Sequence, residues 1–274
     1  VFIEMLIPFL IFLGPKCHRA YASRTNWRPH WKTIKELMRL GWPGSLVSGN
    51  EIVCWSIFMT VLVGLFGTES MAAGWIVLGY MHLSFMPAVA ISFAANTLVG
   101  NSIGAGTPEL AVTRARWSVG LSVVIMSACA VLFVVLREPM VELFIGGDVD
   151  AAESARILDI GVKLMVVMAV CQAMDAIGIT YSGALRGAGD VIWPGFFIAI
   201  SSWVLIIGLG YGLAVLIPEW GAVGPWVGAV VYIIVVGIGM LWRFEGGAWR
   251  SIDIMSAGSD APSSMIPSDD CPRR

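Results

Sequence analysis

Two acidic residues, Glu51 and Asp175, lie inside long apolar stretches of the sequence. An ionised side chain near the centre of a membrane helix costs about 2.5–3.5 kcal/mol on insertion scales, so it is a functional candidate by default. At about 1.5 Å per residue, Glu51 lies roughly 14 Å and Asp175 roughly 10 Å from the same membrane side. Two carboxylates that meet in a low-dielectric cavity favour a proton or a metal ion between them. The pair therefore predicts a Na+ or H+ site, and the alternative is two structural carboxylates hydrogen-bonded to neighbouring helices.

Polar residues near the two acids extend this hypothesis. Amide and hydroxyl oxygens complete the oxygen shell of a bound cation, but the same groups also make ordinary hydrogen bonds between membrane helices. The sequence leaves both readings open. The candidates for a polar shell are Asn50, Gln172, Thr180 and Tyr181.

The composition places these residues in a membrane protein. Of the 274 residues, 57% are hydrophobic and 13% are charged, whereas a soluble domain carries about 25% charged residues. This excludes an ordinary soluble enzyme and a disordered chain, and the net charge of -2 excludes a nucleic-acid binder that relies on a basic surface. The five cysteines lack the spacing of a disulfide scaffold, and the sequence holds no hydrolase, P-loop or zinc-protease motif. We expect an integral membrane protein that is not an enzyme and has no nucleic-acid partner.

Six apolar stretches of spanning length make up most of the chain. They are continuously apolar rather than alternating, which predicts helices and not barrel strands. The stretches are 42–67, 72–99, 117–136, 157–181, 193–217 and 224–242. Tryptophans mark most of their ends, as an aromatic belt at the membrane surface predicts: Trp42, Trp75, Trp117, Trp193, Trp226 and Trp242.

The predicted fold class is therefore an all-α integral membrane protein with a six-helix bundle at 42–242. The end of one more, truncated helix lies at 1–14, before the bundle. A basic loop at 15–41 connects this helix to the bundle. A tail at 243–274 is predicted to be disordered from about residue 255, because it is rich in Ser, Pro and Asp. Since residues 1–14 are too short to span and lack an initiator Met, we expect a fragment.

The basic residues predict the orientation of the bundle. Alternate loops share one membrane side, and the side of the basic loop and the tail holds 14 of the 17 Lys and Arg. By the positive-inside rule this side is cytoplasmic. The prediction is a multi-pass protein of the inner (plasma) membrane, in contact with membrane lipids and with a cytoplasmic C-terminal tail. One of the remaining basic residues, Lys163, lies within a span but close enough to its end to reach the surface.

Three motifs carry a family resemblance. They are Gly41-Trp42-Pro43 with Glu51 eight residues after the proline, the run from Phe93 to Gly106, and Gly183-Ala-Leu-Arg186-Gly187-Ala-Gly189-Asp190 with Asp175 eight residues before it. Together they resemble the multidrug and toxic compound extrusion (MATE) family, over about residues 1–245. The resemblance places the chain at the end of the sixth helix and at helices seven to twelve of that family.

The resemblance implies a twelve-helix transporter made of two six-helix bundles, which exports organic cations and drugs in exchange for Na+ or H+. It implies that Glu51 and Asp175 match the cation-binding acids of the bacterial NorM-type branch, in which coupling is commonly to Na+. It also implies that the protein needs no cofactor beyond the coupling ion. The first bundle, a partner that the mechanism needs, is missing from this sequence. A glutamine of the family motif is Asn101 here, which keeps an amide.

Other functions compete with this hypothesis. A lipid-linked polysaccharide flippase of the same superfamily would need a basic cavity for pyrophosphate, whereas the spans offer carboxylates and only Lys163. A non-transporting membrane scaffold and a membrane-embedded enzyme are the alternatives from other classes. For the transporter, Trp55, Phe58 and Phe85 are candidate aromatic walls for a lipophilic cation.

Overall fold

The computed structural model describes residue 6 and residues 9–14, 31–145 and 150–251. The chain divides into two compact units, Val1–Leu46 and Val47–Arg274. Residues 15–30 of the predicted basic loop and the tail from residue 252 lie outside the described residues. The helix α3, Trp31–Ile57, begins before the predicted span, so residues 31–41 are helical. The reason is local, because Lys, Glu, Leu, Met and Arg in this segment all favour helix.

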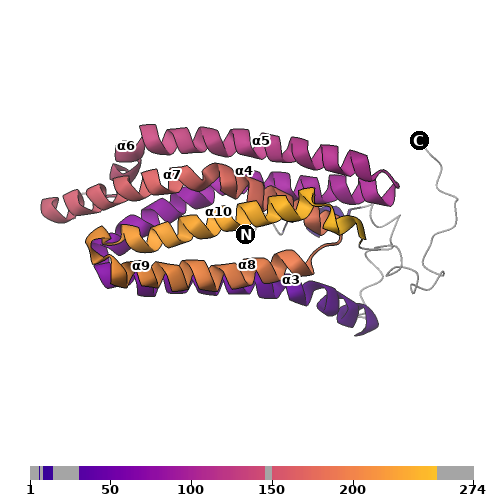
Figure 1. The fold of residues 1–274 in the computed structure, drawn as a ribbon, viewed down its shortest axis with the longest axis horizontal. Coiled ribbons are helices and arrows are strands. Elements are labelled where there is room, and N and C mark those ends of the chain that lie inside the picture. Colours follow the sequence, from indigo (N-terminus) through magenta and orange to yellow (C-terminus); the bar gives the residue numbers. More distant parts are fainter. Residues whose placement is uncertain (1–5, 7–8, 15–30, 146–149, 252–274) are drawn as a thin grey trace. The chain divides into compact units, whose positions relative to one another are not determined.

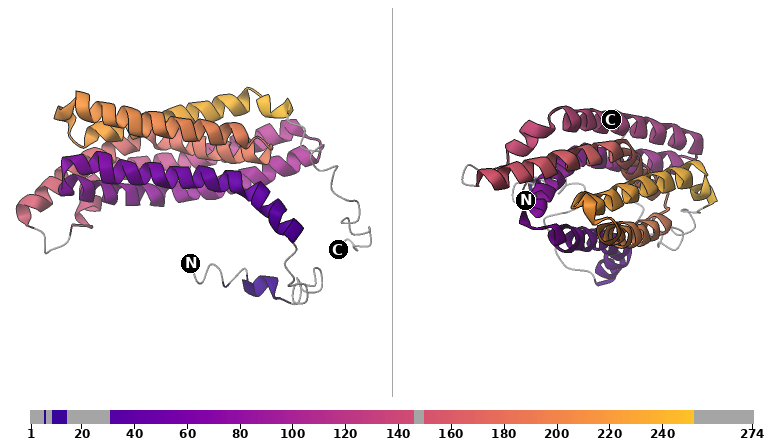
Figure 2. Two further views of the ribbon diagram at one scale, coloured as in Figure 1. Left: turned by 90° about the horizontal axis from the view of Figure 1, so that it is seen from below. Right: turned by 60° about the vertical axis from the view of Figure 1, so that its left-hand side comes forward.

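Six helical segments are long and apolar enough to cross a membrane, as the sequence predicts. The larger unit holds these segments side by side (Figure 1; Figure 2). In chain order they are Gly49–Phe66, α4 (Thr68–Gly104), α5 (Pro108–Val135), α7 (Ala151–Gly187), Ile192–Leu216 and α10 (Val223–Glu245). The first comprises the end of α3 with η1 (Phe58–Val63) and η2 (Gly64–Phe66), and the fifth comprises α8 (Ile192–Ser201), η3 (Ser202–Leu209) and α9 (Gly210–Leu216). The short elements α6 (Arg137–Glu142), η4 (Pro218–Trp220) and η5 (Ala248–Ser251) connect or follow them.

Two helices are longer than the apolar stretches that predicted them. Both α4 and α7 have 37 residues, which is about 55 Å of helix, against a hydrocarbon core of about 30 Å. Polar residues such as Asn101 and Glu153 continue the helices beyond the apolar segments. At one end of the bundle α4 meets α5, α7 meets α8, and α10 ends. We call it the basic end, because Arg114, Arg186 and Arg243 lie there.

The helix α7 is the centre of the bundle, because it packs extensively against α4, α10 and α5. Small residues bring its backbone against α4. A side chain on Gly183 would overlap Ser92, and one on Gly187 would overlap the backbone of Asn96. Close backbone approach through small residues is the usual way to pack helices in lipid, where apolar side chains gain little by leaving the tails. Gly183 and Gly187 of the Gly183–Asp190 motif are thus packing residues, whereas Gly189 takes a positive φ of 80° in the turn that follows α7.

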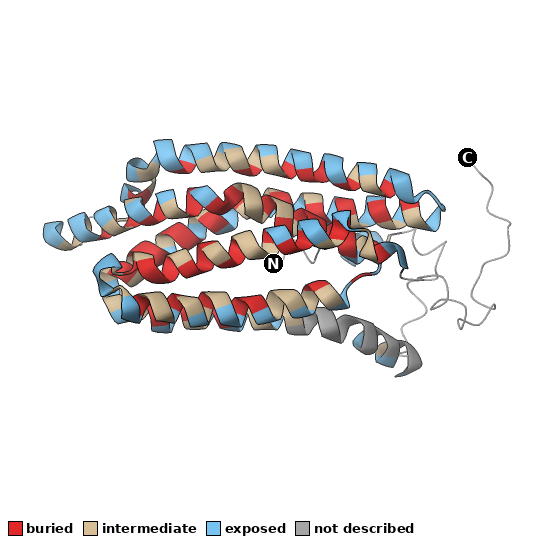
Figure 3. Cartoon of the chain, in the orientation of Figure 1, coloured by how far each residue is buried: buried red, intermediate tan, exposed pale blue. Residues whose placement is uncertain are grey.

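The helix α10 crosses the other side of α7. Gly178 of α7 faces Gly237 of α10, and a side chain on Gly237 would overlap the backbone of Met174. Figure 3 shows that buried positions are dense along α10. Because α7 and α10 approach so closely, polar groups on their facing sides are held at fixed positions.

Two aromatic predictions are corrected by the core. Trp226, predicted to mark the membrane surface, is fully buried, and its ring packs edge-on against Phe58 at 5.3 Å between centroids. Phe58, predicted as a cavity wall, is also fully buried in this core. Both lie where η1 meets α10, so packing between helices outweighs the preference of Trp for the interface.

The close contact between α7 and α4 predicts the effect of Gly187→Val in the full-length protein that contains this chain. The valine methyl groups would force the two helices apart, and overpacking of this kind costs about 1–3 kcal/mol. We expect a lower melting temperature of the purified protein. Gly120→Val on α5 is the matched control, because a Cβ there meets nothing within 4 Å. Equal melting temperatures for the two variants would contradict the packing role.

Candidate functional site

Glu51 lies on α3, half-buried, in the part of the helix that belongs to the larger unit. Its carboxylate oxygen Oε1 accepts a hydrogen bond from the Tyr232 hydroxyl at 3.4 Å. Tyr232 comes from α10, and its side chain is buried. The contact therefore joins the first and the last spans of the bundle at the predicted functional acid.

Asp175 lies on α7, also half-buried. Among the described residues, its carboxylate has no hydrogen-bond partner. Its negative charge interacts with that of Glu51, and Tyr232 interacts electrostatically with both acids. Three oxygen-bearing groups from α3, α7 and α10 thus share one region of an otherwise apolar bundle. Like charges repel strongly at low dielectric, so it is costly to have both acids ionised in this region.

One basic side chain contributes to the same field. Arg186 lies on α7 near the basic end and interacts electrostatically with Glu51. Its guanidinium Nη2 donates to the Ser92 hydroxyl at 3.3 Å. Asp175 and Arg186 are eleven residues apart, which at about 100° per residue places them on the same side of the helix. The region therefore holds two acids and one base.

The four residues of the predicted polar shell make hydrogen bonds to groups other than the two acids. Asn50, next to Glu51 in the chain, donates through Nδ2 to the Ser202 hydroxyl at 3.1 Å and accepts from the Trp203 indole at 2.7 Å. Gln172, one turn before Asp175, is buried and accepts a hydrogen bond from Ser84 at 3.3 Å. Both amides lie within a turn of an acid but bond to other groups.

The two remaining shell candidates bond away from the acids. The Thr180 hydroxyl donates to Ser122 of α5 at 2.8 Å, and the Tyr181 hydroxyl donates to Glu245 of α10 at 2.8 Å. Neither hydroxyl is hydrogen-bonded to Glu51 or Asp175. These contacts tie α7 to its neighbours, as ordinary bonds between membrane helices do.

Tyr232 is the site residue that the sequence reasoning missed. One signal was available, because Tyr232 lies in the middle of an apolar span, far from the membrane surface where tyrosine usually occurs. A buried hydroxyl needs a partner. A mid-span tyrosine therefore belongs with the mid-span acids as a candidate.

A second set of contacts fixes the helix that carries Glu51. Cys54, one turn after Glu51 and fully buried, donates through Sγ to the Ser202 carbonyl at 3.5 Å. Ser202 begins η3, a π-helical segment of eight residues. Wide π-helical turns recur at functional sites, because they displace backbone groups from the regular ladder. Asn50 and Cys54 therefore hold α3 to this irregular segment on both sides of Glu51.

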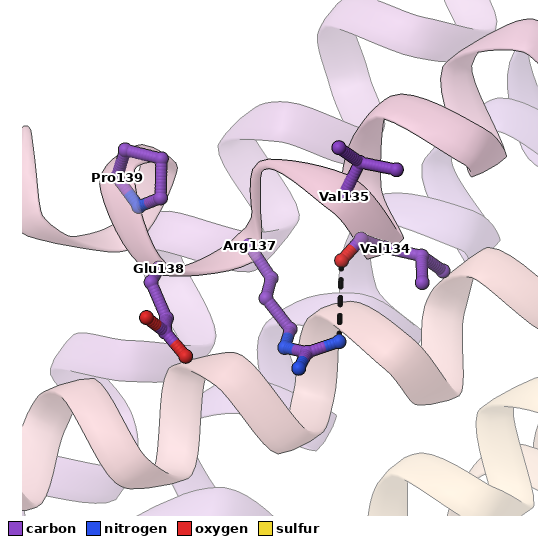
Figure 4. Close-up of a pocket in the computed structure, with 5 residues that line it drawn as sticks. All are labelled: Val134, Val135, Arg137, Glu138 and Pro139. Atoms are coloured by element: carbon purple, nitrogen blue, oxygen red, sulfur yellow. Dashed lines mark hydrogen bonds between the residues drawn. The ribbon is translucent and has the colours of Figure 1, made fainter.

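Other features of the described residues lie away from the acids. Among the described residues, no three His, Cys, Asp or Glu side chains gather closely enough to hold a metal ion. A surface hollow lies at the turn from α5 to α6, lined by Val134, Val135, Arg137, Glu138 and Pro139 (Figure 4). There the Arg137 guanidinium donates to the Val134 carbonyl at 3.2 Å. The hollow shares no residue with the acidic region.

Residues 50–212 match the family model described as MatE, which is more than half of the chain and includes both acids. The chain belongs to the MatE family. The resemblance drawn from the three sequence motifs is therefore confirmed.

Curated relatives of this MatE chain carry drug-resistance names. The multidrug resistance protein NorM of Burkholderia vietnamiensis is 32% identical over 220 residues, which make up 80% of this chain and 46% of that protein. The multidrug resistance protein MdtK of Yersinia pseudotuberculosis is 28% identical over 220 residues, which make up 79% of this chain and 46% of that protein. The MatE chain thus spans about half the length of the relatives it matches.

Solved structures share the fold. A MOP superfamily transporter from Pyrococcus furiosus matches with a TM-score of 0.74 at 18% identity, over 91% of this chain and 56% of that one. An inward-facing multidrug resistance MATE family transporter matches with a TM-score of 0.70 at 19% identity, over 81% of this chain and 50% of that one. The six-helix arrangement is therefore that of about half of such a transporter.

The acid of the third motif has a structural partner in the MatE chain. Asp190, only 4% exposed, accepts a hydrogen bond from Arg243 of α10 at 2.7 Å. The Arg243 guanidinium also lies over the Trp193 ring, 5.1 Å from its centroid. The pair fastens the turn between α7 and α8 to the end of α10 at the basic end.

The burial of this ion pair predicts that Asp190→Asn destabilises the full-length protein by about 2 kcal/mol, because a hydrogen bond to a charged partner is worth about 1.5–3 kcal/mol. The matched control is Glu109→Gln, since the pair of Glu109 with Arg250 is exposed and such pairs contribute about 0–1 kcal/mol. A double-mutant cycle with Arg243→Gln, read by thermal unfolding, measures the coupling. A coupling no larger than that of Glu109 and Arg250 would show that burial adds nothing.

Proposed function

We propose that this MatE chain forms one of two helical bundles of an antiporter that exports organic cations or other drugs in exchange for Na+ or H+. Glu51 and Asp175 are the coupling carboxylates in this proposal. Family membership and the drug-resistance names of the curated relatives support it. Because the chain spans about half of those relatives, the second bundle is a required partner in the proposal.

The observation that carries the proposal is that Glu51 and Asp175, both half-buried inside the bundle, lie close enough to interact electrostatically. The two acids come from α3 and α7, which are separate spans. A cation between them relieves their repulsion and favours the arrangement that brings the two helices together. A ligand shifts a conformational equilibrium only by its difference in affinity for the two states. Two acids on different helices supply such a difference, because only one arrangement presents both to the same ion.

The rest of the transport cycle follows from the same charges. A drug cation in the cleft between the two bundles competes for the carboxylates or favours the state in which they are apart. Half-buried aromatic side chains such as Trp55 and Phe85 line the apolar part of the path in this proposal. Asn50 and Gln172 belong to the polar surroundings of the acids, while Thr180 and Tyr181 serve as ties between helices.

The location of the protein is part of the proposal. A multi-pass MatE protein lies in a membrane, and we assign it to the inner membrane with the basic end in the cytoplasm. The transport function involves no catalytic step. A lipid-linked polysaccharide flippase is disfavoured by charge, because the acidic region holds two acids against one base, Arg186. Lys163, farther along α7, is exposed and pairs with Asp159 at 2.6 Å.

The proposal predicts that Glu51→Gln and Asp175→Asn each lower gradient-driven efflux of an organic cation by about tenfold or more, since coupling between sites amounts to about 5–150-fold. The measurement is the initial efflux rate of the full-length protein in proteoliposomes, with Na+ and pH gradients imposed separately. Asp159→Asn is the matched control, because it makes the same change on the same helix at an exposed position.

The control variant should transport like the parent, and all variants should reach the membrane in equal amounts. Parental efflux by both Glu51→Gln and Asp175→Asn would overturn the assignment of the coupling carboxylates.

A further inference from the structure

The hollow at the turn from α5 to α6 carries two opposite charges at the end of a membrane span. The helix α5 starts at the basic end and finishes at Val135, so the hollow lies at the opposite end of the bundle (Figure 1). Val134 and Val135 give it an apolar side, and Arg137 and Glu138 give it a polar side. The Arg137 and Glu138 side chains extend in the same direction from the turn (Figure 4).

Neither charge is neutralised by the described part of the chain. The Arg137 guanidinium donates one hydrogen bond, to the Val134 carbonyl at 3.2 Å, and has further N–H groups to offer. No described acid forms a salt bridge with it, and the Glu138 carboxylate accepts no hydrogen bond from the described residues. By contrast, Arg156 at the same end of the bundle pairs with Glu69 at 3.4 Å. The two charges of the hollow are therefore available to a ligand.

The surroundings of the hollow are those of a membrane surface. Exposed apolar side chains, including Val131 and Leu132, lead up to it along α5, and Leu143 and Phe144 are exposed just beyond α6. Exposed apolar and charged side chains occur together where a helix lies at the boundary between headgroups and acyl chains. An arginine at the end of a span extends its guanidinium to the headgroups. The apolar side of the hollow thus suits acyl chains, and its polar side suits a headgroup.

The backbone that carries the two charges is firmly held. The Tyr80 hydroxyl of α4 donates to the Met140 carbonyl of α6 at 2.8 Å. Val141 of α6 is fully buried, and it packs so closely on α7 that a side chain on Gly161 would overlap it. These contacts tie α6 to two long spans. A site built on fixed backbone loses less conformational freedom when it binds a ligand.

The chemistry of the two side chains selects a headgroup. A guanidinium binds phosphate through paired N–H donors. A carboxylate accepts hydrogen bonds from a primary ammonium group, whereas a quaternary ammonium group has no N–H to donate. A headgroup that carries both a phosphate and a primary ammonium therefore matches Arg137 and Glu138 together. An anionic headgroup without an ammonium group would leave Glu138 unpaired and beside a negative charge.

We propose that the hollow is a binding site for a zwitterionic phospholipid with a primary ammonium group. The Arg137 guanidinium binds the phosphate, Glu138 accepts hydrogen bonds from the ammonium group, and the acyl chains lie along Val134 and Val135. The site shares no residue with Glu51 and Asp175, so it stands independently of the proposed coupling role.

The test is native mass spectrometry of the full-length protein, titrated in detergent with one lipid at a time. The probes are phosphatidylethanolamine, its trimethylated analogue phosphatidylcholine, and anionic phosphatidylglycerol. We expect the parent to bind phosphatidylethanolamine about fivefold more tightly than either of the others, the size that one exposed ion pair supplies. Affinities within about twofold for all three lipids would overturn the proposal.

Two variants separate the roles of the charges. Arg137→Gln should weaken phosphatidylethanolamine and phosphatidylcholine alike by about fivefold, because both carry the phosphate. Glu138→Gln should lower the affinity for phosphatidylethanolamine to that for phosphatidylcholine and leave phosphatidylcholine unchanged. Glu138 is exposed and unbonded among the described residues, so its variant keeps the test decisive if Arg137→Gln does not fold. Parental affinities in Glu138→Gln would overturn the proposal.

The matched controls make the same charge changes at the same end of the bundle. They are Arg156→Gln, whose arginine already pairs with Glu69, and Glu219→Gln in η4, outside the hollow. Both should bind each lipid as the parent does, and losses equal to those of Arg137→Gln and Glu138→Gln would contradict a local site. Free phosphoethanolamine should not displace the lipid, because it lacks acyl chains. Displacement at equal concentration would overturn the lipid as the occupant.

Discussion

The burial of two acids, Glu51 and Asp175, inside an apolar bundle is the constraint that the rest of the structure must accommodate. Two negative charges inside apolar helices are expensive, and neither α3 nor α7 gains anything from carrying its acid alone. Arg186 offsets part of this cost at Glu51, and in the proposed function a bound cation offsets more of it. Hydrophobic burial and close helix packing must then hold the acids in place while that charge is absent.

The packing of α7 provides this support. Glycines let α7 approach α4 on one side and α10 on the other, so that Asp175 and Tyr232 are carried by helices whose backbones are in contact. Hydrogen bonds from Thr180 and Tyr181 add ties to α5 and α10. The helix with Glu51 is held differently, through Asn50 and Cys54, to a π-helical segment. One acid thus lies on a tightly packed helix and the other on a helix that rests against irregular backbone.

The sequence predicts the six spans well, because they depend on hydropathy along the chain. It says less about which side of a helix a residue faces. Thr180 follows Asp175 by five residues, which turns it by about 140° around the helix, and the structure accordingly directs it to α5. The helical period was available from the sequence and would have separated these two residues. Trp226 shows the opposite limit, since its place in the core depends on Phe58 and on neighbouring spans, which no local pattern encodes.

The central claim is that one monovalent cation binds between Glu51 and Asp175, and anomalous diffraction tests it most directly. Crystals of the full-length protein soaked in Tl+, a heavy monovalent cation, would show where the ion lies. The account predicts a single strong anomalous peak that contacts both carboxylates. A peak elsewhere in the bundle, with none near the two acids, would contradict it.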